Sequence, residues 1–127
     1  MLKNAPVKRV VIAGCRNYNN YYEAKEYIDF CLSNIQKENN IVILSGCASG
    51  ADAIGEKYAK EKGYKVEKHP ADWDTYGKKA GPMRNRQMAE NCDYVICFWD
   101  GKSKGTRSMI EFAKSCKKPI RIKHIEL

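Results

Sequence analysis

The residues best suited to chemistry lie in two short loops that combine glycine with small or hydroxyl-bearing side chains. The first runs from Ser45 to Asp52, with the sequence SGCASGAD, and the second runs from Asp100 to Thr106, with the sequence DGKSKGT. Glycine lets a ligand approach the backbone closely, and the first amides of a helix favour anions. Both loops therefore indicate a phosphate site. The alternatives are a tight turn that needs glycine for its geometry alone, and a plain helix-capping role for Thr106.

An arginine beside the first loop region is a third candidate. Arg16 follows Gly14 after the first predicted strand, and its planar guanidinium can bind a phosphate or carboxylate through two hydrogen bonds. An ordinary surface role for Arg16 is equally consistent with its position.

The stretch from His69 to Arg86 mixes aromatic, acidic and basic residues in a way that neither a core element nor a simple linker requires. Within it, Trp73 or Tyr76 could stack on a base, while Arg84 and Asn85 could bind phosphate or ribose. A role for Trp73 in closing the end of the sheet is the alternative. The complete set of predicted ligand contacts is Gly14, Arg16, Ser45, Gly46, Ala48, Gly50, Ala51, Asp52, Trp73, Tyr76, Arg84, Asn85, Asp100, Ser103, Gly105 and Thr106.

Carboxylates supply the candidates for acid–base catalysis. They are Asp72, Asp74, Asp100 and Glu111, together with Asp52 from the first loop. His69 and His124 fall on predicted strands away from the loops. No Ser/His/Asp or Cys/His arrangement and no metal-ligand spacing stands out, so we expect neither a metal nor a cofactor. Catalysis is an alternative to simple binding.

Five apolar runs alternate with helical patterns and must position these loops. The predicted strands are Lys8–Gly14, Ile41–Ser45, Lys65–His69, Tyr94–Trp99 and Ile120–Ile125. The predicted helices begin at Asn19 or Asn20 and run to Asn39, begin after Gly50 and end at Gly63, begin near Pro82 and end near Asn91, and follow Lys104 up to Pro119. This alternation predicts an α/β fold with a parallel sheet and helices on both faces. In such sheets, ligands bind at the carboxyl ends of the strands.

Length and composition indicate one domain over residues 1–127. No apolar run is long enough for a signal peptide or a membrane span, so we expect a cytoplasmic protein without a membrane partner. The six cysteines are scattered and mostly lie in apolar runs, which is typical of buried thiols in a reducing compartment. Cys15 and Cys47 differ because they fall in loops.

The net charge of +8 indicates an anionic partner, and most of the excess lies from Tyr64 onward. A phosphate-bearing small molecule and a nucleic acid would both account for it. The basic residues are interspersed rather than clustered, which favours the small molecule. Solvated surface lysines explain many of them in either case.

Six motifs in order closely resemble the YspA, cpYpsA-related branch of the SLOG superfamily, from about Arg9 to Ile122. They are GxR at Gly14, SGxAxGADxxG at Ser45, PADW at Pro70, GK at Gly77, AGPxRN at Ala80, and FWDGxSxGTxxMI at Phe98. The wider superfamily includes the Lonely Guy phosphoribohydrolases, the Smf/DprA DNA-processing proteins, and ligand-sensing domains of bacterial and phage conflict systems.

The resemblance implies a Rossmann-like sheet with strand order 3-2-1-4-5 and a nucleotide-derived ligand at the loops described above. Lonely Guy enzymes carry an acid within the pattern PGGxGTxxE, whereas Gly105-Thr106 is followed here by Arg107, Ser108 and Met109. The resemblance is therefore consistent with three functions. The first is a sensor, carrier or sequestering module for a nucleotide-derived ligand, the second is an N-glycosidic hydrolase of nucleotides, and the third is a Smf/DprA-like binder of nucleic acid.

Association into a homodimer is also implied, since relatives often dimerise. Three tyrosines of the first helix, Tyr21, Tyr22 and Tyr27, could form an exposed face for it.

Overall fold

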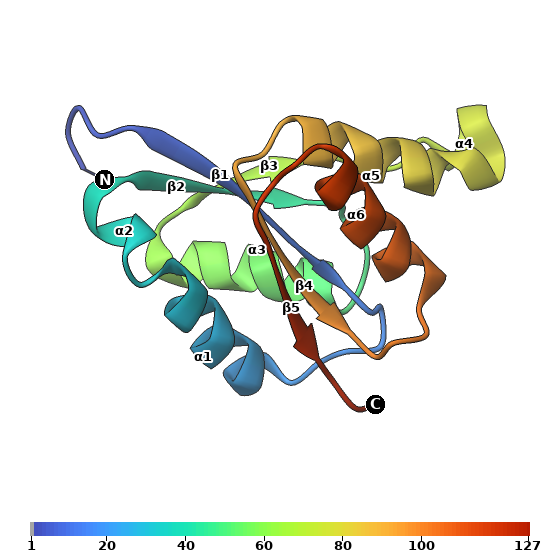
Figure 1. Ribbon diagram of the computed structural model, residues 1–127, viewed down its shortest axis with the longest axis horizontal. Coiled ribbons are helices and arrows are strands. Elements are labelled where there is room, and N and C mark those ends of the chain that lie inside the picture. Colours follow the sequence, from blue (N-terminus) through green and yellow to red (C-terminus); the bar gives the residue numbers. More distant parts are fainter. Residues whose placement is uncertain (1) are drawn as a thin grey trace.

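A central sheet of five parallel strands organises the chain, as seen in a computed structural model that describes residues 2–127 (Figure 1). The strands are β1 (Val7–Gly14), β2 (Asn40–Ser45), β3 (Lys65–Lys68), β4 (Tyr94–Trp99) and β5 (Ile120–His124). Their order in the sheet is β3-β2-β1-β4-β5, and every neighbouring pair is parallel. The predicted fold class and strand order are both confirmed.

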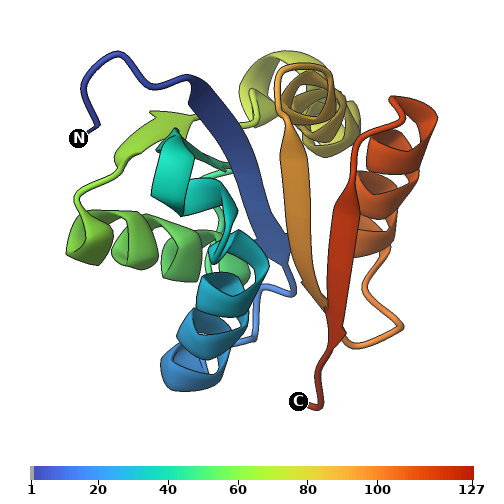
Figure 2. The ribbon, with the colours of Figure 1, turned by 60° about the vertical axis from the view of Figure 1, so that its left-hand side comes forward.

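Helices cover both faces of the sheet (Figure 2). On one face lie α1 (Tyr21–Leu32), α2 (Ile35–Glu38) and α3 (Ala51–Lys62), and on the other lie α5 (Ala80–Glu90) and α6 (Lys104–Ser115). Alternate residues of β1 divide between two buried clusters: Val10 and Ile12 pack with α1 and α3, whereas Val11 and Ala13 pack with α5 and α6. Burial on both faces explains why the strands are continuous apolar runs.

The first predicted helix is interrupted, and this part of the prediction is wrong. The apolar spacing continues to Ile35, but α1 ends at Leu32 and the separate turn α2 begins at Ile35. Between them, the Ser33 hydroxyl donates a hydrogen bond to the Phe30 carbonyl at 3.0 Å. Such bonds from a side chain to the backbone compete with helix continuation. At the other end of α1, Asn20 is the cap, because its Oδ1 accepts from the Glu23 amide at 3.2 Å.

The tyrosines of α1 do not form one exposed face. Tyr22 is 83% exposed, whereas Tyr21 and Tyr27 are half-buried and pack against the core. The Tyr27 ring meets Phe98 edge to face, with 5.8 Å between the ring centroids. Of the three tyrosines expected to form a dimer surface, only Tyr22 is therefore exposed.

The stretch after Pro70 is more regular than its composition predicts. It contains the short helix α4 (Trp73–Tyr76) and the 3-10 turn η1 (Gly77–Lys79), which leads directly into α5 at Ala80. Asp72 caps α4, because its Oδ1 accepts from the Thr75 amide at 3.2 Å. Pro82 lies in the first turn of α5, as predicted. In Figure 1 the α4 segment projects from one end of the molecule beyond the sheet.

The connections after β1 and β4 leave toward opposite faces of the sheet. β1 is followed by α1 on one face, and its neighbour β4 is followed by α6 on the other face. This is the switch point at which open α/β sheets form a crevice at the carboxyl ends of their strands. The crevice lies between the two loops that the sequence singled out.

Candidate functional site

A cavity of about 300 Å³ occupies this switch point. Ten of the predicted ligand contacts line it, which is most of the set named from the sequence. They are Gly14, Arg16, Ala48, Asp52, Arg84, Asn85, Asp100, Ser103, Gly105 and Thr106. The sequence therefore located residues from four separate segments that the fold brings to one place.

Buried polar side chains gather around the same cavity. Within residues 2–127, the polar or charged residues that are buried are Ser45, Asp52, Asn85 and Thr106. Asp52, Asn85 and Thr106 line the cavity itself, and Ser45 lies at the base of the first loop. Burying a polar group costs free energy unless it is hydrogen-bonded, so such a concentration marks the cavity as the polar centre of the fold.

Asp52 is the most unusual of these groups, because it is a carboxylate that is only 6% exposed. Its Oδ2 accepts from the Ala48 amide at 3.1 Å. Its Oδ1 accepts no hydrogen bond within residues 2–127. Every fully buried side-chain oxygen in that range has a partner, so Oδ1 must be accessible, and it faces the cavity that Asp52 lines. Burial raises the pKa of Asp52, with a further increase from Glu56, and the Ala48 amide and Arg84 offset only part of this effect.

Arg84 enters the site from the second turn of α5. Its Nη1 donates to the Gly46 carbonyl, and its Nε donates to Asn85 Oδ1 at 3.0 Å. Burial lowers the pKa of Arg84, and the negative charge of Asp52 opposes this shift. Arginine stays protonated in proteins, so the guanidinium carries its charge beside the cavity.

Gly46 has a close-packing role at this point. A Cβ atom placed there would lie 2.8 Å from both Arg84 Nη1 and Asp52 Oδ2. A larger residue here would have to displace Arg84 or Asp52, so glycine favours the close approach of both side chains to the loop backbone.

Asn85 links the two halves of the site. Its Nδ2 donates to the Gly105 carbonyl at 3.3 Å, while its Oδ1 accepts from Arg84. These bonds join α5 to the start of α6, so the two helices present Arg84 and Thr106 to the same cavity.

The loop before α6 is held by its own side chains. Asp100 Oδ1 accepts from the amides of Lys102 and Ser103, both at 2.9 Å, and these bonds lower the pKa of Asp100. Ser103 caps α6, because its Oγ accepts from the Thr106 amide at 3.3 Å and from the Thr106 hydroxyl at 3.1 Å. The cap of α6 is therefore Ser103 and not Thr106, as one alternative had predicted, whereas Thr106 lines the cavity.

Three amides of the first loop donate to acceptors within the protein. The Cys47 amide donates to Ser45 Oγ at 3.1 Å, the Ala48 amide to Asp52, and the Ala51 amide to the Cys15 carbonyl at 3.2 Å. Ser45 Oγ itself donates to Glu56 at 2.6 Å. Ser45 is therefore placed as a support for the loop, and neither it nor Ala51 is among the residues that line the cavity.

Gly50 supports the loop in a different way. It has φ of 70°, and a Cβ atom there would collide with the carbonyls of Cys15 and Arg16. Together with the bond from Ser49 Oγ to the Arg16 carbonyl at 3.2 Å, this packing fixes the first loop against the segment that carries Arg16.

A groove of about 340 Å³ adjoins the cavity on the side of α4. Trp73, Gly46, Ala48 and both arginines, Arg16 and Arg84, line it. The Arg16 guanidinium lies over the Trp73 ring, with 5.9 Å from Cζ to the ring centroid. The sequence placed Trp73 beside a ligand, and the structure puts it at the entrance to this groove, half exposed.

The remaining sequence candidates lie elsewhere. Of the five carboxylates named as catalytic candidates, Asp52 and Asp100 line the cavity, whereas Asp72 caps α4 and Asp74 and Glu111 are exposed. Tyr76 is 50% exposed and lies in neither the cavity nor the groove.

Several lining residues were not predicted from the sequence. Cys15 and Asn17 come from the loop after β1, and Met88 and Met109 come from α5 and α6. The Cys15 Sγ lies 4.0 Å from Thr106 Oγ1, and burial raises the pKa of the Cys15 thiol. The sequence offered one signal for Cys15, which is its position between Gly14 and Arg16. A residue between two site residues at the end of a strand lies at the same edge of the sheet.

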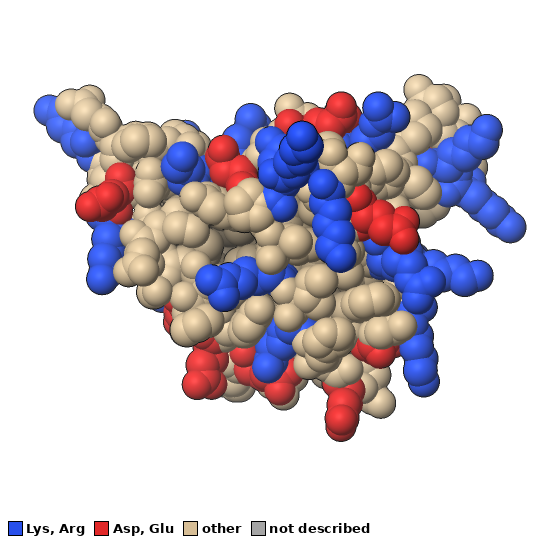
Figure 3. All heavy atoms as spheres, in the orientation of Figure 1, with Lys and Arg blue, Asp and Glu red and all other residues tan. Residues whose placement is uncertain are grey.

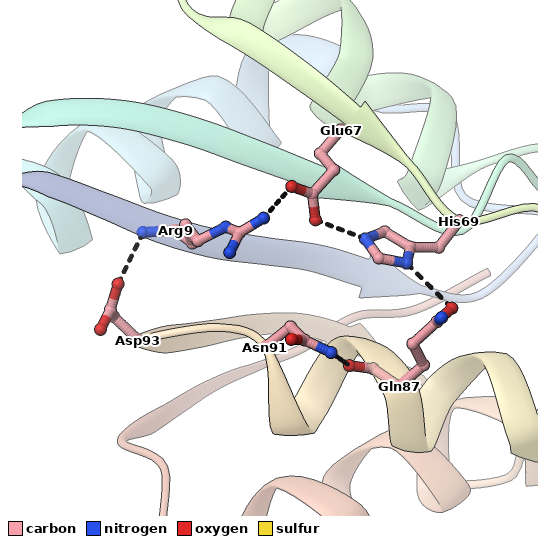
Figure 4. A network of polar contacts seen from close by, with 6 residues as sticks. All are labelled: Arg9, Glu67, His69, Gln87, Asn91 and Asp93. Carbon is pink, nitrogen blue, oxygen red and sulfur yellow. Dashed lines mark hydrogen bonds and ion pairs between the residues drawn. The ribbon is translucent and has the colours of Figure 1, made fainter.

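A separate polar network ties β3 to α5 (Figure 4). His69 Nε2 lies 2.6 Å from Glu67 Oε2, and His69 Nδ1 lies 3.1 Å from Gln87 Oε1. Arg9 of β1 also binds Glu67. Because Gln87 is three residues after Arg84 on α5, this network helps to orient the helix that supplies the arginine.

Two kinds of feature are absent among residues 2–127. No cluster of three or more His, Cys, Asp or Glu side chains has an arrangement that could hold a metal ion. None of the helices has both the length and the apolar character that a bilayer crossing needs.

Comparison with protein families identifies one match. The model of the YspA, cpYpsA-related SLOG family matches residues 8–76, from β1 to the end of α4. The Gene 61 protein of Mycobacterium phage D29 is 37% identical over 86 residues, which cover 63% of this chain and 69% of that protein. The matched family region contains the first loop, Arg16 and Trp73, and it ends before Arg84.

Comparison with solved structures extends over nearly the whole fold. DNA processing protein A (DprA) from Streptococcus pneumoniae superposes with a TM-score of 0.72 at 20% identity over 96% of this chain, which spans only about half, 52%, of that protein. TM1055 gives a TM-score of 0.63 at 21% identity, covering 89% of this chain and 72% of TM1055. DprA from Helicobacter pylori, described for its binding of single-stranded DNA, gives 0.61 at 23% identity, covering 98% and 68%. At such identities the likeness is one of fold.

Proposed function

Since the chain belongs to the YspA, cpYpsA-related SLOG family, we propose that it binds a nucleotide or nucleotide-derived phosphate ligand in the cavity at the carboxyl ends of its strands. The observation that carries this proposal is the convergence of Arg16 and Arg84 with the buried polar groups of Asn85 and Thr106 on one cavity. Guanidinium groups bind phosphate through paired hydrogen bonds, and a partly desolvated site strengthens that attraction.

The start of α6 supplies further donors for the phosphate. The amides of Lys104 and Gly105 are the first two of the helix and have no acceptor within it. By contrast, the first loop has committed its Cys47, Ala48 and Ala51 amides internally. We therefore place the phosphate at the two arginines, within reach of the first amides of α6, and we assign the first loop to the placement of Asp52.

Calorimetric titration with AMP and ADP tests this proposal on wild-type protein and on Arg84→Gln. We expect binding by the wild type and at least a tenfold loss of affinity in the variant, because a phosphate would lose a charged partner. Arg86→Gln is the matched control, since Arg86 lies on the same helix, is exposed and does not line the cavity. Equal affinities for Arg84→Gln and the wild type would contradict the assignment, and absence of binding to any nucleotide-derived ligand would refute the proposed function.

Hydrolysis of an N-glycosidic bond is a second candidate function. The observation that favours it is the presence of two carboxylates, Asp52 and Asp100, in the wall of the same cavity. A buried carboxyl with a raised pKa suits proton transfer, and a carboxylate can stabilise the positive charge that develops on a ribosyl ring. Release of free base from nucleoside monophosphates, measured by chromatography and abolished in Asp52→Asn, would support an enzyme. No release from any of the common monophosphates would exclude it.

Binding of nucleic acid is a third candidate, favoured by the charge of +8 and by the likeness of fold to DprA. On the face shown in Figure 3, basic side chains are dispersed among acidic and uncharged ones rather than gathered in one stripe. A nucleic-acid complex depends steeply on salt, because bound counterions are released. Retention on single-stranded DNA that falls steeply between low and moderate salt would support this candidate, and no retention at low salt would remove it.

A further inference from the structure

Two hollows at the carboxyl edge share one wall. Arg16, Ala48 and Arg84 line both the cavity of about 300 Å³ and the adjoining groove of about 340 Å³. Ligand sites for drug-sized molecules span roughly 300 to 1,000 Å³, so each hollow is at the lower limit of this range. Each one is suited to part of a nucleotide-derived ligand, and the two together to a larger one.

The two hollows differ in chemistry. The cavity contains two carboxylates, Asp52 and Asp100, and the amide of Asn85. The groove contains no acidic residue among those that line it, and its charged side chains are the two shared arginines. Carboxylates accept hydrogen bonds from hydroxyl groups and repel phosphates, so the cavity suits a hydroxyl-rich group at the carboxylates and an anion only at the arginines.

Trp73 gives the groove an aromatic wall. The indole contacts Gly81, where a Cβ atom would lie 3.0 Å from Trp73 Cη2, and the Arg16 guanidinium lies over the ring. Despite these contacts, the side chain is 47% exposed. An indole that is held by these contacts and is still open to solvent is suited to stacking on a planar group.

We propose that the ligand spans both hollows, with a planar base against Trp73, phosphates between Arg16 and Arg84, and a second sugar beside Asp52. The ligand class is then a nucleoside diphosphate that carries a sugar. This inference rests on the proposed function. It follows from the order of the side chains along the carboxyl edge of the sheet: the indole of Trp73 comes first, then the two arginines, then the carboxylate of Asp52.

The test compares three ligands of increasing length by calorimetry: AMP, ADP and ADP-ribose. The same comparison with UMP, UDP and UDP-glucose covers the second common base class. We expect the sugar-bearing diphosphate of one series to bind at least tenfold more tightly than the corresponding diphosphate and monophosphate. Asp52→Asn should remove the gain that the second sugar provides, because the free Oδ1 that accepts the sugar hydroxyl becomes less basic.

Trp73→Ala should weaken binding of all base-bearing ligands in that series by about tenfold, with Tyr76→Ala as the matched control. Tyr76 is an equally exposed aromatic residue of the same short helix that does not line the groove. Tryptophan fluorescence gives an independent measurement that does not depend on the alanine variant folding. The chain has two tryptophans, so ligand-induced quenching should disappear in Trp73→Phe and persist in Trp99→Phe.

The outcomes separate this inference from the function on which it rests. Equal affinities for the monophosphate, the diphosphate and the sugar-bearing diphosphate would overturn it and leave nucleotide binding standing. Unchanged affinity and quenching in the Trp73 variants would overturn the placement of the base. If no member of either series binds, both the inference and the proposed function fail.

Discussion

Replacing Ser45 by alanine should destabilise the protein without weakening ligand binding. The Ser45 hydroxyl donates to Glu56 at 2.6 Å and accepts from the Cys47 amide at 3.1 Å, and the residue is 1% exposed. A hydrogen bond to a charged group contributes about 1.5 to 3 kcal/mol. Glu56 is partly exposed and Cys47 is exposed, so water can replace part of both interactions. We therefore expect a loss of about 1.5 kcal/mol in the free energy of unfolding.

Urea unfolding measures this loss directly, and thermal unfolding should show a fall in Tm of about 4 to 8 °C for a domain of this size. Ser108→Ala is the control, because Ser108 is half-buried on α6 and its hydroxyl makes no hydrogen bond that is found among residues 2–127. Its free energy of unfolding should change by less than about 0.5 kcal/mol. A tenfold loss of ligand affinity in Ser45→Ala at unchanged stability would refute the reasoning, because it would place the hydroxyl on the ligand.

Three further changes test other parts of the site. Gly46→Ala should lower the free energy of unfolding by about 1 to 3 kcal/mol in urea, because its methyl group would collide with Arg84 and Asp52. Burial raises the pKa of Glu67, but the hydrogen bonds from His69 and Arg9 outweigh this effect and lower the pKa below 4.5. The stability that Glu67 contributes is therefore present above that pH and is lost below it. Glu67→Gln should flatten the pH dependence of urea unfolding in this acidic range. Cys47 is the one exposed cysteine, so a thiol reagent should modify it first in the native protein.

Each of these has a control or a contradicting result. Gly105→Ala should be tolerated, because nothing lies within 4 Å of a Cβ atom at that position. A stability profile of Glu67→Gln that is parallel to that of the wild type from pH 3 to pH 6 would contradict the assigned ion pair. A rapid phase of thiol modification that persists in Cys47→Ser would place the reactive cysteine elsewhere.

The sequence predicted the sheet because its strands are buried on both faces. Runs such as Val10 to Ala13 and Val95 to Phe98 are apolar at every position, which only a doubly covered parallel strand requires, and glycines or polar loops mark their ends. The interruption between α1 and α2 was not predictable from apolar spacing, because it depends on a hydrogen bond made by Ser33. Apolar periodicity indicates which residues face the core, but it does not indicate where a side chain competes for the hydrogen bonds of the helix backbone.

The site was predicted in outline for a related reason. The carboxyl ends of parallel strands meet at one edge, so residues after β1, β2 and β4 had to be neighbours. The sequence does not reveal which groups bind each other within that edge. It named Ser45 as a ligand contact because the residue begins a loop of small residues, and the structure pairs the Ser45 hydroxyl with Glu56, eleven residues along the chain.

The free-energy cost of burying the charged groups of Asp52 and Arg84 is the strongest physical argument for a functional role of the cavity. The pKa of Asp52 is raised and that of Arg84 is lowered, so for both groups burial disfavours the charged form more than the surrounding charges favour it. Buried charged groups in this condition contribute little to stability, and apolar residues of similar volume would often fold as well. Gly46 nevertheless leaves room for both groups, and one oxygen of Asp52 stays open to the cavity. Two such groups beside one hollow are consistent with the proposed binding site, since perturbed ionisable groups gather at binding and catalytic sites.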